Sequence, residues 1–140
     1  MPHVIMITTS GAGLYEFTQN VDDWLTCSNR ASDGVLTLFV QHTSCSLLIQ
    51  ENADPDVQSD MNAFFQRLVP DANNPEMKYL RHIYEGPDDM PAHIKAALLP
   101  VSLSIPVSGG KMMLGRWQGI YLFEHRARPH RREVVLHLSA

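Results

Sequence analysis

The sequence contains only two cysteines among 140 residues and has no apolar run that could cross a membrane. A membrane-spanning helix needs about 18 or more consecutive apolar residues. The first residues also lack the basic and then apolar pattern of a secretory signal, so we expect a cytoplasmic protein with no membrane partner. In that compartment Cys27 and Cys45 are predicted to be reduced thiols, although the two could pair.

Positive charge is also scarce. A formal net charge of -4 argues against a general nucleic-acid binder, and no nucleic-acid partner is expected. Between Glu51 and Asp89 there are nine acidic and three basic residues, whereas the chain from Lys111 onward has six basic and two acidic ones. The acidic segment 51–89 therefore suits the binding of cations, and the C-terminal arginines suit the binding of anions. The alternative for any single arginine is a solvated position on the surface.

The sequence lacks the usual nucleotide-binding motifs. Ser108-Gly-Gly-Lys111 has neither the spacing nor the following helix of a Walker motif, so it predicts a hairpin turn. The segment 114–119 is more informative, because its two glycines permit close approach of a ligand and Gln118 adds a side-chain amide. The alternative is a bulge with Trp117 in the core.

Length and a hydrophobic content of 44% suit a single domain, residues 1–140. Strands are predicted at 3–9, 35–40, 45–49, 101–107, 112–124 and 132–138. Helices are predicted from Asn20 to about Arg30, after Asp54, and at 92–99 behind Pro91. Because strands and helices do not alternate regularly, we predict an α+β fold, a mainly antiparallel sheet or sandwich with about three helices.

The helix after Asp54 carries the clearest signals. Asp54 supplies a cap and Pro55 fits the first turn. Four apolar residues recur at helical spacing and are expected to pack inward: Val57, Met61, Phe64 and Leu68. Asp60 lies one turn after Asp56, so these carboxylates and that of Asp54 could face one point near the helix start. The alternatives are a cap for Asp54 and a solvated helix face for Asp60.

Three histidines mark the candidate site, since His42, His82 and His93 each stand where an apolar segment ends or begins. Imidazole beside carboxylate binds divalent ions and also transfers protons. Because imidazole favours zinc, iron or nickel over Mg²⁺, we predict a transition-metal site with these three histidines as ligands. His93 lies in the first turn of the predicted third helix, which favours a neutral imidazole. The alternative is that each histidine has its own hydrogen-bond partners, in the core or at the surface, and that the three do not form one site.

Cys45 follows Thr43 and Ser44 and could be a nucleophile activated by His42. However, neighbouring residues on a strand point to opposite faces, and nothing in the sequence fixes a thiol–imidazole contact. We therefore predict a buried and inert thiol at Cys45.

Several motifs occur in series along nearly the whole chain. They are His42-Thr-Ser44, Glu51-Asn-Ala-Asp-Pro-Asp56 with Asp60, His82 with Glu85-Gly86, Asp88 with Pro91-Ala-His-Ile-Lys-Ala96, Ile105-Pro-Val107, and Leu114-Gly-Arg-Trp-Gln-Gly119 with Glu124. This series resembles the YjbQ-like family, some members of which are named secondary thiamine-phosphate synthases. Two positions depart from the usual pattern: Cys45 replaces a small residue and Asp89 replaces asparagine.

The resemblance implies a YjbQ-like fold, a homotrimer, and a polar pocket that holds the histidines and acids. It also implies a reaction that joins an aminopyrimidine-methyl diphosphate to a thiazole phosphate. Such a reaction needs a divalent ion, neutralisation of the leaving diphosphate and exclusion of water. Mg²⁺ is the alternative ion, brought by the diphosphate. The chain is too short for the barrel of ordinary thiamine-phosphate synthases, so a shared activity would be convergent.

Two hypotheses of function follow. The first is a metal-assisted enzyme acting on a small phosphorylated or diphosphorylated substrate. Its catalytic acids and bases would be Glu51, Asp60 and Asp88, and its substrate-binding residues would be Thr43, Ser44, Asn52, Arg116 and Gln118, with Arg116 meeting phosphate oxygens. The second is a trimeric metal- or small-ligand-binding protein without turnover.

Overall fold

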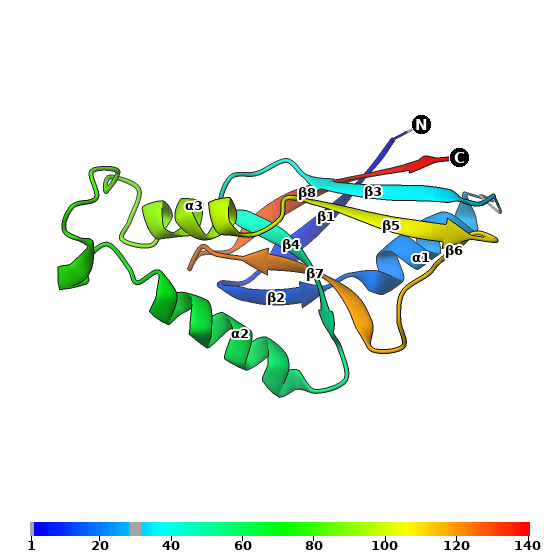
Figure 1. The fold of residues 1–140 in the computed structure, drawn as a ribbon. Helices are drawn as coiled ribbons and strands as arrows, with labels where there is room; N and C mark the ends of the chain where they lie inside the picture. Colours follow the sequence, from blue (N-terminus) through cyan, green and yellow to red (C-terminus); the bar gives the residue numbers. More distant parts are fainter. Residues whose placement is uncertain (1, 29–31) are drawn as a thin grey trace.

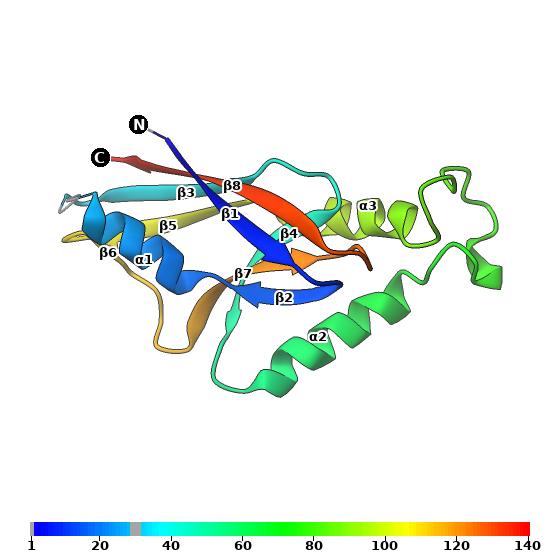
Figure 2. The ribbon, with the colours of Figure 1, turned by 180° about the vertical axis from the view of Figure 1, so that it is seen from behind.

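Two antiparallel sheets form the body of the protein, with α2 and α3 at one end and α1 at the other (Figures 1 and 2). The computed structural model describes residues 2–28 and 32–140. The strands are β1 (His3–Thr9), β2 (Gly13–Glu16), β3 (Gly34–Val40), β4 (Cys45–Glu51), β5 (Ser102–Ser108), β6 (Lys111–Met112), β7 (Gln118–Glu124) and β8 (His130–Ser139). The helices are α1 (Thr18–Cys27), α2 (Pro55–Leu68) and α3 (Asp89–Leu98), with a 3₁₀ turn η1 (Pro75–Met77). The predicted α+β class is confirmed.

The larger sheet has the strand order β1-β8-β3-β5-β6 and the smaller one has β2-β7-β4. In the smaller sheet β4 pairs with β7 along its whole length, so Cys45 lies opposite Glu124 and Glu51 lies opposite Gln118. The two ends of this strand pair are therefore about 20 Å apart, at a rise of about 3.3 Å per residue. This length separates groups of residues that the sequence suggested as one site.

The core lies where the two sheets and α1 meet. In β3 alternate residues are buried, which is the period of a strand with one face covered. The buried apolar residues include Leu36, Leu38, Val40, Ile105, Val134 and Leu136 of the larger sheet, Leu47, Ile120 and Leu122 of the smaller sheet, and Val21 and Leu25 of α1. No helix within residues 2–28 and 32–140 is both long and apolar enough to cross a membrane.

Two helices begin earlier than the sequence predicts. α1 starts at Thr18 rather than at Asn20, and its expected end near Arg30 falls outside the described residues. α3 starts at Asp89, three residues before the predicted start. Pro91 can lie within this first turn because the first N–H groups of a helix have no partner inside it. The earlier start moves His93 from the first turn to the second.

The predicted strand 112–124 is two strands, β6 and β7, separated by residues 113–117. Gly115 N–H donates to Gln118 Oε1 at 2.7 Å and closes the turn before β7. Trp117 is 55% exposed, so its predicted alternative position in the core is wrong. The Arg116 guanidinium lies over the Trp117 ring, 4.8 Å from its centroid.

α2 has the predicted cap, because Asp54 Oδ1 accepts from Asp56 N–H at 2.9 Å. The predicted inward face is wrong: Phe64 is 57% and Leu68 is 53% exposed, and α2 has no fully buried residue. The helix instead contacts the sheet through Phe65, whose ring meets the edge of the Phe123 ring. Helical spacing identified an apolar stripe but not which neighbour covers it.

Candidate functional site

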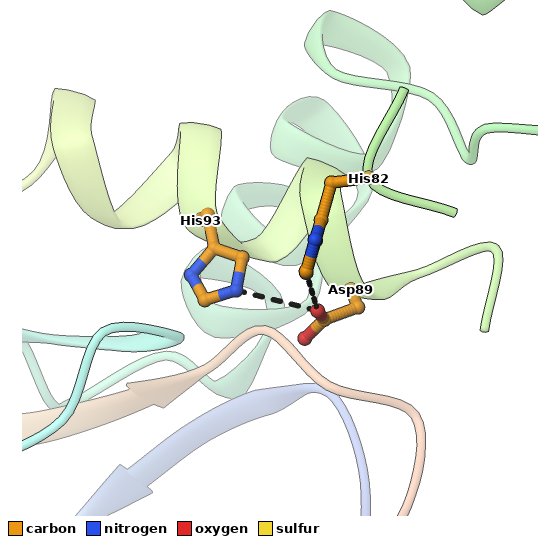
Figure 3. A group of neighbouring side chains, drawn as sticks. All are labelled: His82, Asp89 and His93. Atoms are coloured by element: carbon orange, nitrogen blue, oxygen red, sulfur yellow. Dashed lines mark hydrogen bonds and ion pairs between the residues drawn. The ribbon is translucent and has the colours of Figure 1, made fainter. Parts of the chain in front are cut away.

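Three side chains converge at the start of α3: His82, Asp89 and His93 (Figure 3). His82 Nε2 lies 2.7 Å and His93 Nε2 lies 3.3 Å from the same oxygen, Asp89 Oδ2. Within the described chain these three ligand atoms, all within 4.8 Å of one another, could hold a metal ion. Two imidazole nitrogens and one carboxylate oxygen are a donor set that suits zinc or iron.

The helix explains part of this arrangement. Asp89 and His93 are four residues apart on α3, and side chains at that spacing lie on one face. His82 comes from the irregular segment between η1 and α3. The Asp89 side chain is only 3% exposed, whereas those of His82 and His93 are 46% and 30% exposed. The site thus has a buried carboxylate with two imidazoles open toward solvent.

Arg126 fixes the carboxylates at this helix start. Its Nη1–H donates to Asp89 Oδ1 at 2.7 Å and its Nε–H donates to Asp88 Oδ2 at 2.9 Å. Ala127 N–H also donates to Asp88 Oδ2. Burial alone would raise the pKa of Asp88 and Asp89, but these hydrogen bonds, the contact with His82 and the Arg126 charge hold both below the usual value. Both acids therefore stay ionised at neutral pH, and Asp88 serves to hold Arg126.

The backbone of Thr43 sets the tautomer of His93. His93 Nδ1 lies 2.9 Å from the Thr43 carbonyl oxygen, which is only an acceptor, so Nδ1 carries the hydrogen. In the neutral ring Nε2 then carries a lone pair instead of a hydrogen, and this lone pair faces those of Asp89 Oδ2. A cation between these two atoms, either a proton or a metal ion, is required to make this contact favourable.

A cavity of about 540 Å³ opens beside His93. Its polar wall includes His42 and Thr43, and its apolar wall includes Phe39, Ala96 and Val101. This volume lies within the usual range of roughly 300–1,000 Å³ for small-molecule sites. A ligand in this cavity would touch His93 directly.

His42 lines this cavity but lies outside the His82–Asp89–His93 group. Its Nε2 accepts from Glu133 N–H at 2.8 Å, so that nitrogen is already engaged. Burial and the Arg132 charge hold the pKa of His42 below its usual value. The structure thus brings together two of the three histidines predicted as ligands, with His42 as a neutral cavity wall.

A buried ion pair lies beneath the loop that carries Thr43. Arg132 and Glu124 are 4% and 0% exposed and are joined through Arg132 Nη2 and Nε. Arg132 Nη2 also donates to Ser44 Oγ at 2.9 Å, and Thr9 Oγ1 donates to Glu124 Oε1 at 2.7 Å. Ser44, predicted to bind substrate, is therefore a buried part of this network.

The other predicted site residues lie elsewhere. Glu51, Asn52 and Gln118 are at the far end of β4 and β7, and Asn52 donates to Glu16 Oε2 at 3.2 Å. Arg116 is exposed in the loop before β7, and Asp60 is exposed on α2. In one subunit these residues do not join the cluster at α3.

Sequence reasoning named Asp88 as the acid, whereas Asp89 makes the contacts with both histidines. The spacing of four residues to His93 is the signal that could have identified it. Arg126 carries no such signal, because it lies 37 residues from Asp89 and only the fold brings the two together. Cys27 and Cys45 are free thiols, and Cys45 is fully buried. Burial raises the pKa of the Cys45 thiol to about 12, which supports its predicted inertness.

Comparison with known proteins gives one consistent result. A family described as UPF0047 protein YjbQ-like matches residues 3–140. UPF0047 protein sll1880 of Synechocystis is 47% identical over 97% of this chain and 89% of its own length. UPF0047 protein YjbQ of Escherichia coli O157:H7 is 42% identical over 96% of this chain and 94% of its own length.

Solved structures agree with the sequence comparison. The conserved hypothetical protein TT1486 of Thermus thermophilus superposes with a TM-score of 0.84 at 34% identity, over 98% of this chain and 99% of that one. A protein of Clostridium acetobutylicum described as an uncharacterised member of the yjbq/upf0047 family gives a TM-score of 0.81 at 32% identity, over 98% of this chain and 99% of that one.

Proposed function

This chain belongs to the YjbQ-like UPF0047 family, and from the geometry at the start of α3 we propose that it is a metal-assisted enzyme acting on a small phosphorylated or diphosphorylated substrate. One observation carries the proposal. His93 Nε2 lies 3.3 Å from Asp89 Oδ2 while His93 Nδ1 is committed to the Thr43 carbonyl, so Nε2 and Oδ2 are both placed to bind one cation. A divalent ion held by His82, Asp89 and His93 satisfies all these atoms at once.

The donor set fits a transition metal. Two imidazoles and one carboxylate suit zinc or iron, and Mg²⁺ would be a weaker fit unless it arrived with a substrate diphosphate. When bound, the ion would neutralise charge on phosphate oxygens and so favour departure of the leaving group. Arg126 donates to Asp89 Oδ1 while Oδ2 faces the two histidines, and this arrangement supports the proposed role.

Thiamine-phosphate synthesis is the specific reaction that we propose to test. In it a thiazole nitrogen forms a bond to the methylene carbon of the aminopyrimidine while the bond from that carbon to diphosphate breaks. The cavity beside His93 would hold the organic part of a substrate against the apolar wall at Phe39 and Ala96. His42, held neutral by burial and Arg132, would be a hydrogen-bonding group on the polar wall.

Asp89→Ala tests this assignment, because asparagine, the usual residue of the family at this position, would keep a side-chain oxygen. The change removes the carboxylate charge, so we expect turnover to fall about 100-fold or more, as the loss of a metal ligand would cause. The measurement is diphosphate release from the aminopyrimidine-methyl diphosphate and the thiazole phosphate, with zinc or Mg²⁺ added. Asp56→Ala makes the same change at an exposed position on α2 and should leave turnover unchanged. Absence of diphosphate release by the wild-type protein with either ion would overturn this reaction.

We further propose that the protein is a homotrimer. Arg116 can meet a phosphate in the α3 site only if another subunit supplies it, because within one subunit it lies at the far end of β4 and β7. Supporting this, the outer face of the larger sheet exposes Val4, Met6, Val35 and Phe39, each between 43% and 49%. Val4 and Phe39 both pair with Val135, so they form one row across three strands.

Phe39→Glu should therefore shift the oligomer toward monomer, because a charge in an apolar contact between subunits costs several kcal/mol. Light scattering after size exclusion gives the mass directly, against 15.8 kDa for one chain. Phe64→Glu makes the same change at a 57% exposed position on α2, away from this face, and is the matched control that should leave the mass unchanged. A wild-type protein that runs as a monomer would contradict the trimer.

A metal- or ligand-binding role without turnover is the second candidate. It is favoured by one observation: Glu51 and Asp60, the predicted acids and bases besides Asp88, do not reach the cavity in one subunit. Metal bound in wild-type protein together with no turnover of any phosphorylated substrate would support this role.

A further inference from the structure

A second cavity, of about 370 Å³, lies on the other side of α3 from the metal cluster. Lys95 follows His93 by two residues, which turns its side chain by about 200° around the helix. The cavity is bounded by Asp71, Asn73 and Asn74 of the segment after α2, and by His125 at the end of β7. These segments meet beside α3 in Figure 1.

Lys95 is an unusual residue to find in this wall. It is only 6% exposed, and among the described residues it has neither an ion pair within 4.0 Å nor a side-chain hydrogen bond. The other two lysines, Lys78 and Lys111, are exposed. Burial lowers the pKa of Lys95, and the charges of Asp71 and Asp88 oppose that effect from a distance. Lysine is rarely buried without a partner.

His125 provides a second unused group. It is 3% exposed, and its Nδ1 has no hydrogen-bond partner within the described structure. Its Nε2 lies 2.9 Å from the buried Ser46 hydroxyl, whose proton has no other acceptor among the contacts of that side chain. Nε2 therefore accepts, and Nδ1 carries the hydrogen as an unsatisfied donor. Lys95 and His125 line the same cavity, and the Lys95 charge, after burial, contributes to lowering the pKa of His125.

The acids of the cavity do not supply the missing partner. Asp88 is engaged by Arg126 and Ala127 N–H. Asp71 is exposed, and it forms no ion pair with Lys95. Asn74 Oδ1 accepts from Glu76 N–H, which leaves the Asn74 amide N–H groups free to donate. The inner wall thus presents the Lys95 ammonium group without an acceptor, beside a buried imidazole whose Nδ1 also has no partner.

We propose that this cavity binds a small organic oxyanion, a carboxylate or a phosphate ester, whose oxygens accept from Lys95 Nζ. Asn74 would donate to the same ligand, and the exposed Asp71 would face its uncharged end. The site is separate from the metal cluster and does not rest on the proposed function. Both oxyanions share this recognition, so the test uses one probe of each kind.

Lysine side-chain NMR is a direct test, because the chain has only three lysines. Protein labelled at lysine is titrated with inorganic phosphate and, separately, with acetate, at constant ionic strength set by chloride and with EDTA present. Lys78→Met and Lys111→Met assign the signals without touching Lys95. We expect the Lys95 signal to move and saturate with at least one probe while the other two do not. No saturable change of Lys95 with either probe would overturn the proposal.

Two variants add an independent readout by calorimetry. Lys95→Met should weaken binding of the active probe at least about 10-fold, since a hydrogen bond to a charged group is lost. Lys78→Met is the matched control and should bind like the wild type. Asp71→Asn removes a nearby negative charge and should strengthen binding a few-fold. Unchanged affinity in Lys95→Met would place the anion elsewhere. EDTA removes divalent ions, so anion binding at Lys95 is measured without the metal site. A failure of the metal site would therefore leave this result unchanged.

Discussion

Arg132→Met is expected to destabilise the fold by about 3–5 kcal/mol, the usual cost of removing one partner of a buried ion pair. The change leaves Glu124 fully buried, with Thr9 Oγ1 and Arg126 N–H as hydrogen-bond donors and His130 Nδ1 4.0 Å away. Burial would raise the pKa of Glu124, but the Arg132 hydrogen bond and charge hold it below the usual value. Urea denaturation followed by circular dichroism measures the loss.

The matched variants are Arg131→Met and the double change Arg132→Met with Glu124→Leu. Arg131 is exposed and its substitution should cost little. The double variant removes both charges and should recover part of the lost stability, because the uncompensated carboxylate is gone. A single variant that is as stable as the wild type would show that this ion pair does not hold the fold.

The ion pair of Arg132 and Glu124 also supports the loop that orients His93. Arg132 binds Ser44, and the preceding Thr43 carbonyl orients His93. Loosening Arg132 should therefore release the His93 ring as well as weaken the core. This links the buried end of β7 and β8 to the first turns of α3.

Acidification from pH 6.5 to pH 3 should cost on the order of 4 kcal/mol through His125 alone, at about 1.36 kcal/mol per unit of pKa shift. Burial, assisted by the Lys95 charge, lowers the pKa of His125 to about 3. In the unfolded chain the imidazole takes up its proton near pH 6.5, so the unfolded state binds more protons between these two pH values. Stability from this group is therefore full above pH 6.5 and falls as the pH drops toward 3.

His125→Gln tests this expectation. Without the titrating ring, the free energy of unfolding should depend much less on pH between 4.5 and 6.5. His42, whose pKa is also lowered, acts in the same direction and will leave a smaller slope. The acids with lowered pKa, Asp88, Asp89 and Glu124, lose their contribution at still lower pH. His137→Gln changes an exposed histidine and should keep the wild-type slope. Equal slopes in His125→Gln and wild type would contradict the buried neutral ring.

The sequence predicted the strands better than their interruptions. Alternation in Val35 to Val40 and apolar content in Cys45 to Ile49 marked β3 and β4. The turn at Met113 to Trp117 was missed because Gly115 was interpreted as a ligand approach or a bulge within one strand, whereas the bond from Gly115 N–H to the Gln118 side chain closes a turn there. The exposed face of α2 was missed because periodicity cannot identify the partner of a stripe.

The candidate site was predicted in part. The rings of His82 and His93 are in contact, because the segment before α3 folds back beside that helix. Thr43, by contrast, contributes its backbone carbonyl, which has no signature in a side-chain motif. Glu51 and Gln118 were grouped with the histidines because the motifs run in series, yet β4 separates them by its own length. Arg126, one of the C-terminal arginines predicted to suit anions such as phosphate, instead holds both acids of α3.

The measurement that tests the metal site most directly is the metal content of protein purified without a histidine tag, determined by elemental mass spectrometry. The variants are His82→Ala, His93→Ala and His42→Ala, each checked for folding by circular dichroism. We predict about one zinc, iron or nickel ion per subunit in the wild type and in His42→Ala, and loss of that ion in His82→Ala and His93→Ala. A wild-type protein that holds no ion even after incubation with zinc, or folded His82→Ala and His93→Ala variants that keep it, would contradict the metal site at α3.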